Sequence, residues 1–315
     1  MSKDEYLITD APLKALTVFA MPMILGSFFQ QIYNMADSII VGQFVGSSAL
    51  AAVGACAALT NVFICVALGA GVGAGVLVSR YFGARDYGKM KTIVSTSLIS
   101  FLILSILLGV FGFGFSHFMM SLLQTPPDIL DEAVLYLRVY FVGFPFLFMY
   151  NILSTMFTSI GESRIPLVLL IFSSVLNIFL DILFIVPFHM GVSGAAWATI
   201  LSQFLSAVLS LVVGLKNFSI LHLHRDDFTD LKDTAVLHLK TGFPMGFQMS
   251  VMCIGQLAMQ TVVNSLGTAA VAGYTAASKA DQLSVLVNNA MMTAISNYVA
   301  QNFGAGKKGR IRQGV

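Results

Sequence analysis

Long apolar stretches, each able to cross a lipid bilayer, dominate this sequence of 315 residues. A bilayer core requires about 20 mostly apolar residues per helix. Only 10% of the residues are charged, whereas a soluble domain carries about 25%. The sequence therefore predicts an all-α polytopic membrane protein with eight transmembrane helices. The expected spans are 15–43, 49–79, 92–116, 132–157, 165–187, 192–215, 236–265 and 269–300.

The basic residues lie almost entirely on one side of this predicted bundle. Of the 17 Lys and Arg residues, all but Arg138 and Lys279 precede the first span, occupy even-numbered loops or follow the eighth span. The positive-inside rule then places both termini in the cytoplasm, with the bundle in the cell membrane. The acidic N-terminus has no basic region of the kind that begins a signal peptide, so the first helix is expected to remain in the mature protein.

Several functional classes are disfavoured by composition. A net charge of +2 provides no basic surface of the kind that binds nucleic acid. The three cysteines form no disulfide framework, and the five histidines lie in loops or at span ends. No nucleophile–base or metal constellation is found within the spans. We therefore expect a protein that is not an enzyme and has no cofactor.

An internal repeat relates the two ends of the chain. The segments 20–23, 46–51 and 82–89 resemble 242–245, 267–272 and 303–310, with offsets of 222 and then 221 residues. Because six spans separate the copies, both run in the same direction through the membrane, as do the parallel repeats of some transporters. The repeat predicts three parts of the chain: a six-helix lobe (1–215), a cytoplasmic linker (216–235) and the first two helices of a second lobe (236–315).

The second copy is expected to be incomplete. A full copy would require four more helices, or twelve in all, and would end at about residue 440 by the repeat offset. We therefore expect this chain to be a C-terminally truncated form.

Three polar residues are expected in one layer of the membrane. Counting along the spans places Asp37, Asp181 and Thr199 about 9–10 Å below the outer surface, at 1.5 Å per residue. Charged groups inside spans are costly and are functional candidates by default. The alternative is that such groups only hydrogen-bond helices together.

Further polar residues share faces with these acids. Asn177 is four residues before Asp181, and Gln30 and Asn34 precede Asp37 at helical spacing. Carboxylates with an amide and a hydroxyl form an oxygen cluster that suits a proton or a hard cation such as Na⁺. The sequence predicts a cation or proton site at Asp37, Asn177, Asp181 and Thr199, with Gln30 and Asn34 as cavity residues.

Lys279, Asp281 and two prolines complete the set of unusual residues within spans. Lys279 and Asp281 are two residues apart and do not face each other on a regular helix. One interpretation that stays open is that Lys279 extends to the membrane surface while Asp281 faces a cavity. Pro22 and Pro244 are expected to kink their helices. A proline of this kind is often only a packing kink.

Four motifs resemble the multidrug and toxic compound extrusion (MATE) family. They are YNMADSIIVG at 33–42, FGAR at 82–85, NIFLD at 177–181 and GAAWAT at 194–199. The resemblance implies a V-shaped bundle of two six-helix lobes that exports amphipathic or cationic drugs in exchange for H⁺ or Na⁺.

The resemblance also implies residue roles. Asp37, Asn177, Asp181 and Thr199 match the cation site of the DinF-like branch, which lies in the N-terminal lobe. Pro22 matches the proline proposed to bend the first helix. The seventh span lacks the acid of the NorM-like branch around Met252 to Gln256.

Two alternatives to an antiporter stay open from the sequence. One is a flippase for lipid or polysaccharide precursors, built on a related bundle; its anionic substrate would require Arg or Lys in the cavity. The other is a non-transporting fragment. The partners expected for the antiporter are small-molecule substrates and the lipid bilayer, without nucleic acid.

Overall fold

The computed structural model describes residues 5–123, 125–218, 231–265 and 268–315, and all regular elements in these ranges are helices. Most of the expected linker, residues 219–230, lies outside the described residues. The all-α expectation is confirmed. The helices are α1 (Tyr6–Thr9), α2 (Pro12–Phe44), α3 (Ser47–Gly83), α4 (Tyr87–Leu122), α5 (Pro127–Val142), α6 (Phe144–Ser159), α7 (Arg164–Ile185), α8 (Gly191–Asn217), α9 (Leu231–Ser265), α10 (Thr268–Gly304) and α11 (Lys308–Gly314).

Several helices are long and apolar enough to cross a membrane. Among the described residues, five qualify: α2, the Ser47–Cys65 part of α3, α4, α7 and α8. The bent pair α5 and α6 forms a sixth if it is one span. The protein thus has the helices of a multi-pass membrane protein, and the total of eight spans stays a prediction.

The fourth expected span, 132–157, is broken in the structure. Its residues form α5 and α6, which meet at Gly143 with a bend of 50°. Pro145, in the first turn of α6, has no N–H and its ring clashes with the carbonyl four residues earlier. A Cβ at Gly143 would collide with the side chain of Ile200 on α8. The break therefore brings the backbone at Gly143 against α8.

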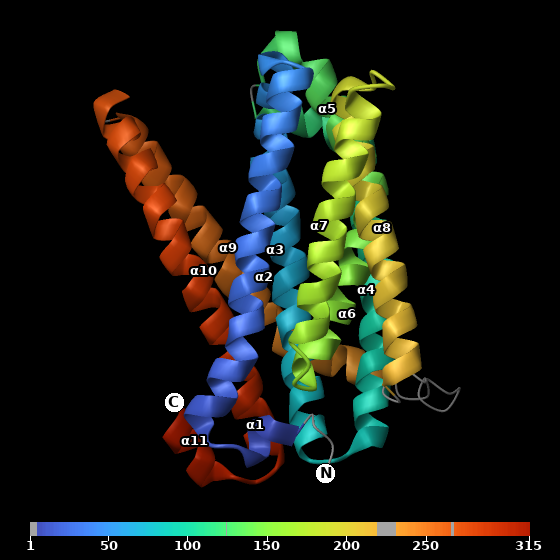
Figure 1. The fold of residues 1–315 in the computed structure, drawn as a ribbon, viewed down its shortest axis with the longest axis vertical. Helices are drawn as coiled ribbons and strands as arrows, with labels where there is room; N and C mark the ends of the chain where they lie inside the picture. The colour runs from blue at the N-terminus through green and yellow to red at the C-terminus, as the bar shows by residue number, and fades with distance from the viewer. Residues whose placement is uncertain (1–4, 124, 219–230, 266–267) are drawn as a thin grey trace.

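Helices α2 to α8 form one bundle, whereas α9 and α10 lean away from it towards the top of Figure 1. All of α2, α3, α9 and α10 meet near the lower end, where α1 and α11 also lie (Figure 1). The centre of the bundle is filled by an aromatic cluster that includes Phe63, Phe141, Phe144 and Phe148. The division into two lobes and a linker stays a prediction.

The internal repeat is visible in the helix boundaries. Helices α3 and α10 begin 221 residues apart and also end 221 residues apart. The turns that follow them correspond as well, because Arg85 (φ 57°) and Gly306 (φ 73°) both have left-handed backbone conformations. The repeated sequence therefore produces a repeated helix and turn.

Two equivalent glycines join the repeats at the lower end of the molecule. A Cβ at Gly83 would collide with the carbonyl oxygen of Gln301, and a Cβ at Gly304 would collide with that of Arg80. Residues 80 and 301 are themselves repeat equivalents. Helices α3 and α10 thus cross through a contact with local two-fold symmetry, as in an isologous interface.

A second glycine crossing joins α3 to α9. Gly69 contacts the backbone of Gly246, and a Cβ on Gly73 would lie 2.7 Å from the backbone nitrogen of Gly242. Small residues four apart let membrane helices approach at backbone distance. The glycine-rich stretch of α3 is therefore a helix-packing surface.

Candidate functional site

The four side chains of the predicted cation or proton site come together in the structure. Asp37 lies on α2, Asn177 and Asp181 lie on α7, and Thr199 lies on α8. Asp181 is 0% exposed and Asn177 is 1% exposed, while Asp37 and Thr199 are half-buried. The four-residue spacing of Asn177 and Asp181 places both on the face of α7 that packs between α2 and α8.

A hydrogen-bond network links α7 to α8. The side-chain amide of Asn177 is oriented so that both its nitrogen and its oxygen form hydrogen bonds. Asn177 Nδ2 donates to Asp181 Oδ2 at 2.8 Å, and Asn177 Oδ1 accepts from the Thr199 backbone N–H at 3.2 Å. The Thr199 hydroxyl donates to the Ala195 carbonyl at 3.0 Å. It also bonds to the side chain of Tyr33, and since its one proton is used, it accepts there.

The two carboxyl groups contact each other across α2 and α7. A side-chain hydrogen bond joins Asp37 and Asp181. Each also keeps a buried Oδ1 that has no hydrogen-bond partner among the described residues. An ionised carboxylate only accepts hydrogen bonds, so a proton on one of the two groups would let that group donate to the other. The pair can hold a proton, or it can offer carboxylate oxygens to a hard cation.

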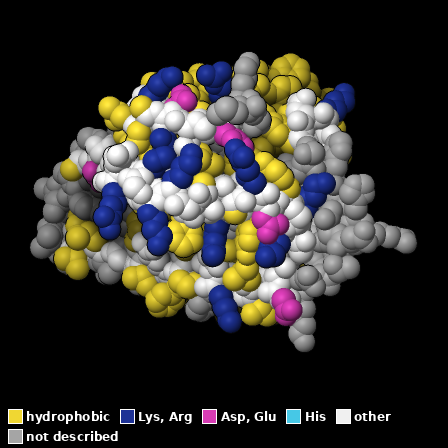
Figure 2. Space-filling model, turned by 90° about the horizontal axis from the view of Figure 1, so that it is seen from below, with side chains coloured by type: hydrophobic (Ala, Val, Ile, Leu, Met, Phe, Trp, Pro, Cys, Tyr) yellow, Lys and Arg dark blue, Asp and Glu magenta, His cyan; other side chains and the backbone are white. Residues whose placement is uncertain are grey.

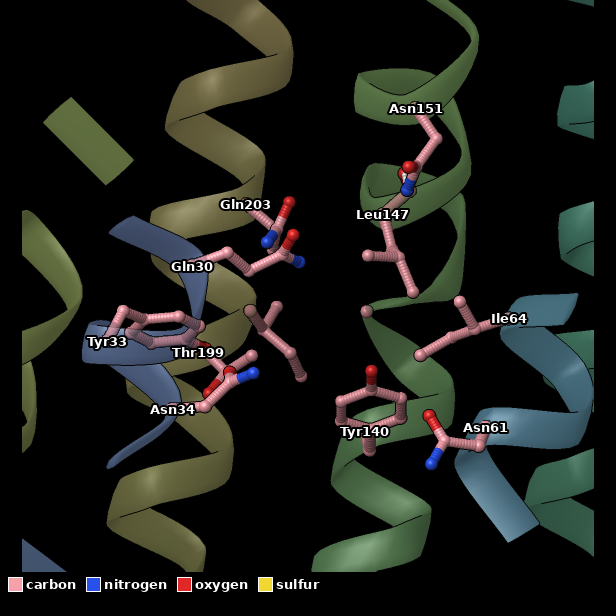
Figure 3. Close-up of a pocket in the computed structure, with 12 residues that line it drawn as sticks. Gln30, Tyr33, Asn34, Asn61, Ile64, Tyr140, Leu147, Asn151, Thr199 and Gln203 are labelled. Carbon is pink, nitrogen blue, oxygen red and sulfur yellow. Dashed lines mark hydrogen bonds between the residues drawn. The ribbon is translucent and has the colours of Figure 1, made fainter. Parts of the chain in front are cut away.

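A cavity of about 340 Å³ lies beside this pair. It is lined by the amides of Gln30, Asn34, Asn61, Asn151 and Gln203, together with Tyr33, Tyr140, Thr199, Ile64, Leu147, Gly143 and Ile200. Figure 3 shows these side chains entering from α2 and α8 on one side and from α3, α5 and α6 on the other. None of the lining residues that the structure describes carries a charge. The described lining of the cavity is therefore polar and uncharged. Tyr33 and Thr199 belong both to this lining and to the network around the acid pair.

A second cavity, of about 270 Å³, lies between α2, α6, α7 and α10. Pro22 lines it together with Asn289 and Thr293 of α10, and Gln30 and Asn151 line both cavities. Helix α2 continues through Pro22 from Pro12 to Phe44. The expected helix-bending residue thus faces the space between the bundle and α10.

Several lining residues are not singled out by the sequence argument. Tyr33 lies four residues before Asp37 and Gln203 four residues after Thr199, so the same spacing rule would have included both. Three other lining residues are polar groups within apolar stretches: Asn61, Tyr140 and Asn151. That placement is the only sequence signal for them. The ring of Tyr140 stacks on that of Tyr136, with 6.0 Å between the ring centroids.

Other candidates lie elsewhere. Asp281 is exposed on α10, and the side chain of Lys279 is outside the described residues. Arg138 Nε donates to Ser116 Oγ at 3.1 Å, away from the acid pair. In the described part of the chain, no cluster of three His, Cys, Asp or Glu residues could hold a metal ion.

Comparison with known proteins gives a consistent result. The MatE family model matches residues 22–183 and 244–315. The chain is 34% identical to the probable multidrug resistance protein YpnP of Bacillus subtilis, over 95% of this chain and 67% of YpnP. It is 27% identical to the multidrug export protein MepA of Staphylococcus saprophyticus, over 96% of this chain and 67% of MepA. The chain thus spans about two thirds of the length of these relatives.

Solved structures agree with the sequence relatives. A MOP superfamily transporter from Pyrococcus furiosus superposes with a TM-score of 0.92 at 26% identity, covering 100% of this chain and 70% of that chain. The outward-facing conformation of a multidrug resistance MATE family transporter gives the same TM-score, identity and coverage. From the family model, the relatives and the shared fold together, this chain belongs to the MatE family of membrane transporters.

Proposed function

We propose that this chain is a secondary active antiporter that exports amphipathic or cationic small molecules in exchange for a proton, with Na⁺ as the competing coupling ion. The relatives named as multidrug export and multidrug resistance proteins support drug export. The observation that carries the proposal is the pair formed by the half-buried Asp37 and the fully buried Asp181 beside a cavity whose described lining is uncharged.

The acid pair supplies the coupling in this proposal. Buried ionised groups without partners are unfavourable in a membrane protein. The Oδ1 atoms of Asp37 and Asp181, which have no partner in the described part of the chain, therefore favour uptake of a positive charge. The hydrogen bond between the two acids supports a proton, and the pair would titrate as a unit. Na⁺ would instead use the oxygens of Asp37, Asn177, Asp181 and Thr199. Ion and drug would each favour a different conformation.

The cavity supplies the drug site. Its five amides and two tyrosines offer both hydrogen-bond donors and acceptors. A flippase for anionic lipid or polysaccharide precursors would require cations here, and no Lys or Arg is found among the described residues that line the cavity. Its chemistry therefore favours neutral or cationic compounds.

The proposed topology has eight spans, a six-helix lobe over 1–215, a linker over 216–235 and the start of a second lobe over 236–315. Both termini would be cytoplasmic. Figure 2 views the lower end, where Lys and Arg side chains are spread across the face. Exposed basic residues at this end include Lys14, Arg80, Arg85, Lys89, Arg164, Lys216, Lys240, Lys307, Lys308 and Arg312. This pattern supports a cytoplasmic lower end.

The test is drug accumulation in cells that express this chain. Asp37→Asn is expected to abolish export of a fluorescent organic cation at unchanged protein level, whereas Asp281→Asn, at an exposed acid on α10, is the matched control that retains it. Unchanged export by Asp37→Asn would exclude the coupling role. In proteoliposomes, imposed pH and Na⁺ gradients then distinguish the two ions, and drug movement driven only by Na⁺ would overturn the proton assignment.

A further inference from the structure

A buried polar cluster joins α10 to the bundle at the lower end of the molecule. Its members are Ser79 of α3, Ser159 of α6, and Asn297 and Gln301 of α10. Each of them is at most 5% exposed. Polar groups buried in a membrane protein are unfavourable unless they form hydrogen bonds, and they are often functional. This cluster is separate from the acid pair and has no part in the proposed drug site.

The cluster is centred on the backbone carbonyl of Ser159. Ser159 is the last residue of α6, and the last carbonyls of a helix have no partner within it. Ser79 Oγ donates to this carbonyl at 2.9 Å, and Gln301 Nε2 donates to it at 2.8 Å. The end of α6 is therefore capped by two side chains, one from α3 in the bundle and one from α10.

Gln301 is the stronger of the two links between α10 and the bundle. The other link is Ser79 Oγ, which lies 2.8 Å from Asn297 Oδ1. The Ser79 hydroxyl has one proton, so it donates at any moment either to Asn297 or to the Ser159 carbonyl. Gln301 Nε2 donates without such competition. Its Oε1 is buried with no partner among the described residues, so the Gln301 amide is only half satisfied in this arrangement.

These polar residues occur in only one copy of the internal repeat. The offset of 221 residues pairs Asn297 with Val76 and Gln301 with Arg80. Arg80 is exposed, and its guanidinium lies over the ring of Phe303 at 5.3 Å. The crossing of α3 and α10 is therefore symmetric in its backbone contacts but not in its polar side chains. The polar cluster is an addition on α10 that the repeated backbone contact does not require.

The cluster lies where α10 meets the bundle. In Figure 1, α9 and α10 diverge from α2 to α8 towards the upper end and approach them near the lower end. The close contact of Gly83 with the Gln301 carbonyl oxygen is part of the same crossing. A conformation that opens at the lower end has to separate α10 from the end of α6. That movement breaks the bond between Gln301 and the Ser159 carbonyl.

We propose that the bond from Gln301 Nε2 to the Ser159 carbonyl is a clasp that holds the lower end closed and is released when this end opens. Water that enters the opened end would bond to both released groups, so the clasp biases the conformational equilibrium by one net hydrogen bond. Gln301 is a positioning residue, because it acts through the placement of α10. The inference rests on the proposed function only in requiring that the lower end opens.

The test measures how often the lower end is open. Pulsed electron paramagnetic resonance reports the distance between spin labels in Lys216→Cys and Arg312→Cys, at exposed positions on α8 and α11, in a chain whose natural cysteines are replaced by alanine. Gln301→Met keeps the length of the side chain but cannot donate. It should raise the ratio of longer to shorter distances about fivefold, the factor expected for one net hydrogen bond.

Ser159→Ala is the matched control. It retains the carbonyl and removes only a hydroxyl that bonds to Thr155 within α6, so the ratio of distances should stay the same. Asn297→Ala is the second variant, in case Gln301→Met does not fold. It removes the weaker link and should shift the ratio in the same direction by a smaller factor.

Two results would overturn the clasp. One is an unchanged ratio in Gln301→Met, or in Asn297→Ala if Gln301→Met does not fold, with only a lower melting temperature; this would assign the cluster to static packing. The other is an equal shift in Ser159→Ala. The distances are measured without drug or ion gradient, so failure of the proposed export function would leave this result unaffected.

Discussion

Asp37 on α2 and Asp181 on α7 share a side-chain hydrogen bond inside the bundle, and each keeps a second buried oxygen with no partner among the residues that the structure describes. A pair retained only for stability would have its oxygens satisfied, because buried polar groups without hydrogen bonds are unfavourable. The incomplete satisfaction of this pair supports the proposal that it exchanges a proton or a cation.

The first prediction is that neutralising either acid does not destabilise the fold. In Asp181→Asn the side-chain oxygen can still accept from Asn177, and the buried negative charge is removed. Replacing buried charges is often neutral or stabilising, so the melting temperature in detergent should stay the same or rise while coupled export is lost. Asn177→Ala is the contrast, because it removes the bond to Asp181 at 2.8 Å and should cost about 1–3 kcal/mol. A lower melting temperature for Asp181→Asn would indicate a structural role.

The second prediction concerns Gln203, which lines the cavity beside the acid pair. Its buried Oε1 has no hydrogen-bond partner in the described structure, so Gln203→Leu should stabilise the protein by about 1 kcal/mol, the scale of one unsatisfied polar group. The same change should weaken binding of hydrogen-bonding substrates, a common conflict between stability and function. Thermal unfolding and drug-binding fluorescence measure the two effects. Unchanged drug binding would place the substrate elsewhere.

The third prediction concerns the glycine crossing of α3 and α9. A methyl group at Gly73 would lie 2.7 Å from the backbone nitrogen of Gly242, so Gly73→Ala must separate the helices and should cost about 1–3 kcal/mol. Gly54 lies on the same helix with no atom within 4 Å of the added Cβ. Gly54→Ala is therefore the matched control, and should be neutral or slightly stabilising. Equal melting temperatures for the two variants would refute a close crossing.

Membrane helices are predictable from sequence because the bilayer imposes both length and apolarity. That constraint gave the helical class, and the repeat correctly anticipated the matching ends of α3 and α10. Counting residues from span ends placed Asp37, Asp181 and Thr199 at one depth, and the structure brings them together. Depth along a helix is fixed by span length, so it can be read from sequence.

Rotation about the helix axis is harder to predict. In a membrane both the lipid-facing and the packed sides are apolar, so hydropathy does not show that Asn61 and Asn151 face one cavity. Hydropathy does not reveal the break between α5 and α6 at Gly143 for a similar reason. Pro22 lies inside an uninterrupted helix, while Pro145 begins a new one. The two prolines differ in their surroundings. Gly143, two residues before Pro145, packs against Ile200, and this is a tertiary contact.

The last prediction concerns the N-terminal segment. Helix α1 has only four residues, too few to be stable alone, yet Leu7 is fully buried. Its place is held by Arg310, which donates to the Leu7 carbonyl at 3.3 Å and to the Asp10 carbonyl. Asn302 Nδ2 adds a bond to the Leu7 carbonyl at 3.0 Å. Hydrogen bonds from a charged group contribute about 1.5–3 kcal/mol.

Arg310→Ala should therefore release this segment. Amide hydrogen exchange over residues 6–10 should accelerate about tenfold, the factor that corresponds to about 1.4 kcal/mol of local opening. Arg312→Ala is the control, since Arg312 is exposed two residues away on α11 and should leave exchange unchanged. Exchange that stays slow in Arg310→Ala would show that burial of Leu7 and the remaining bonds from Asn302 to the Leu7 carbonyl and from Lys307 to the Ile8 carbonyl hold the segment without Arg310.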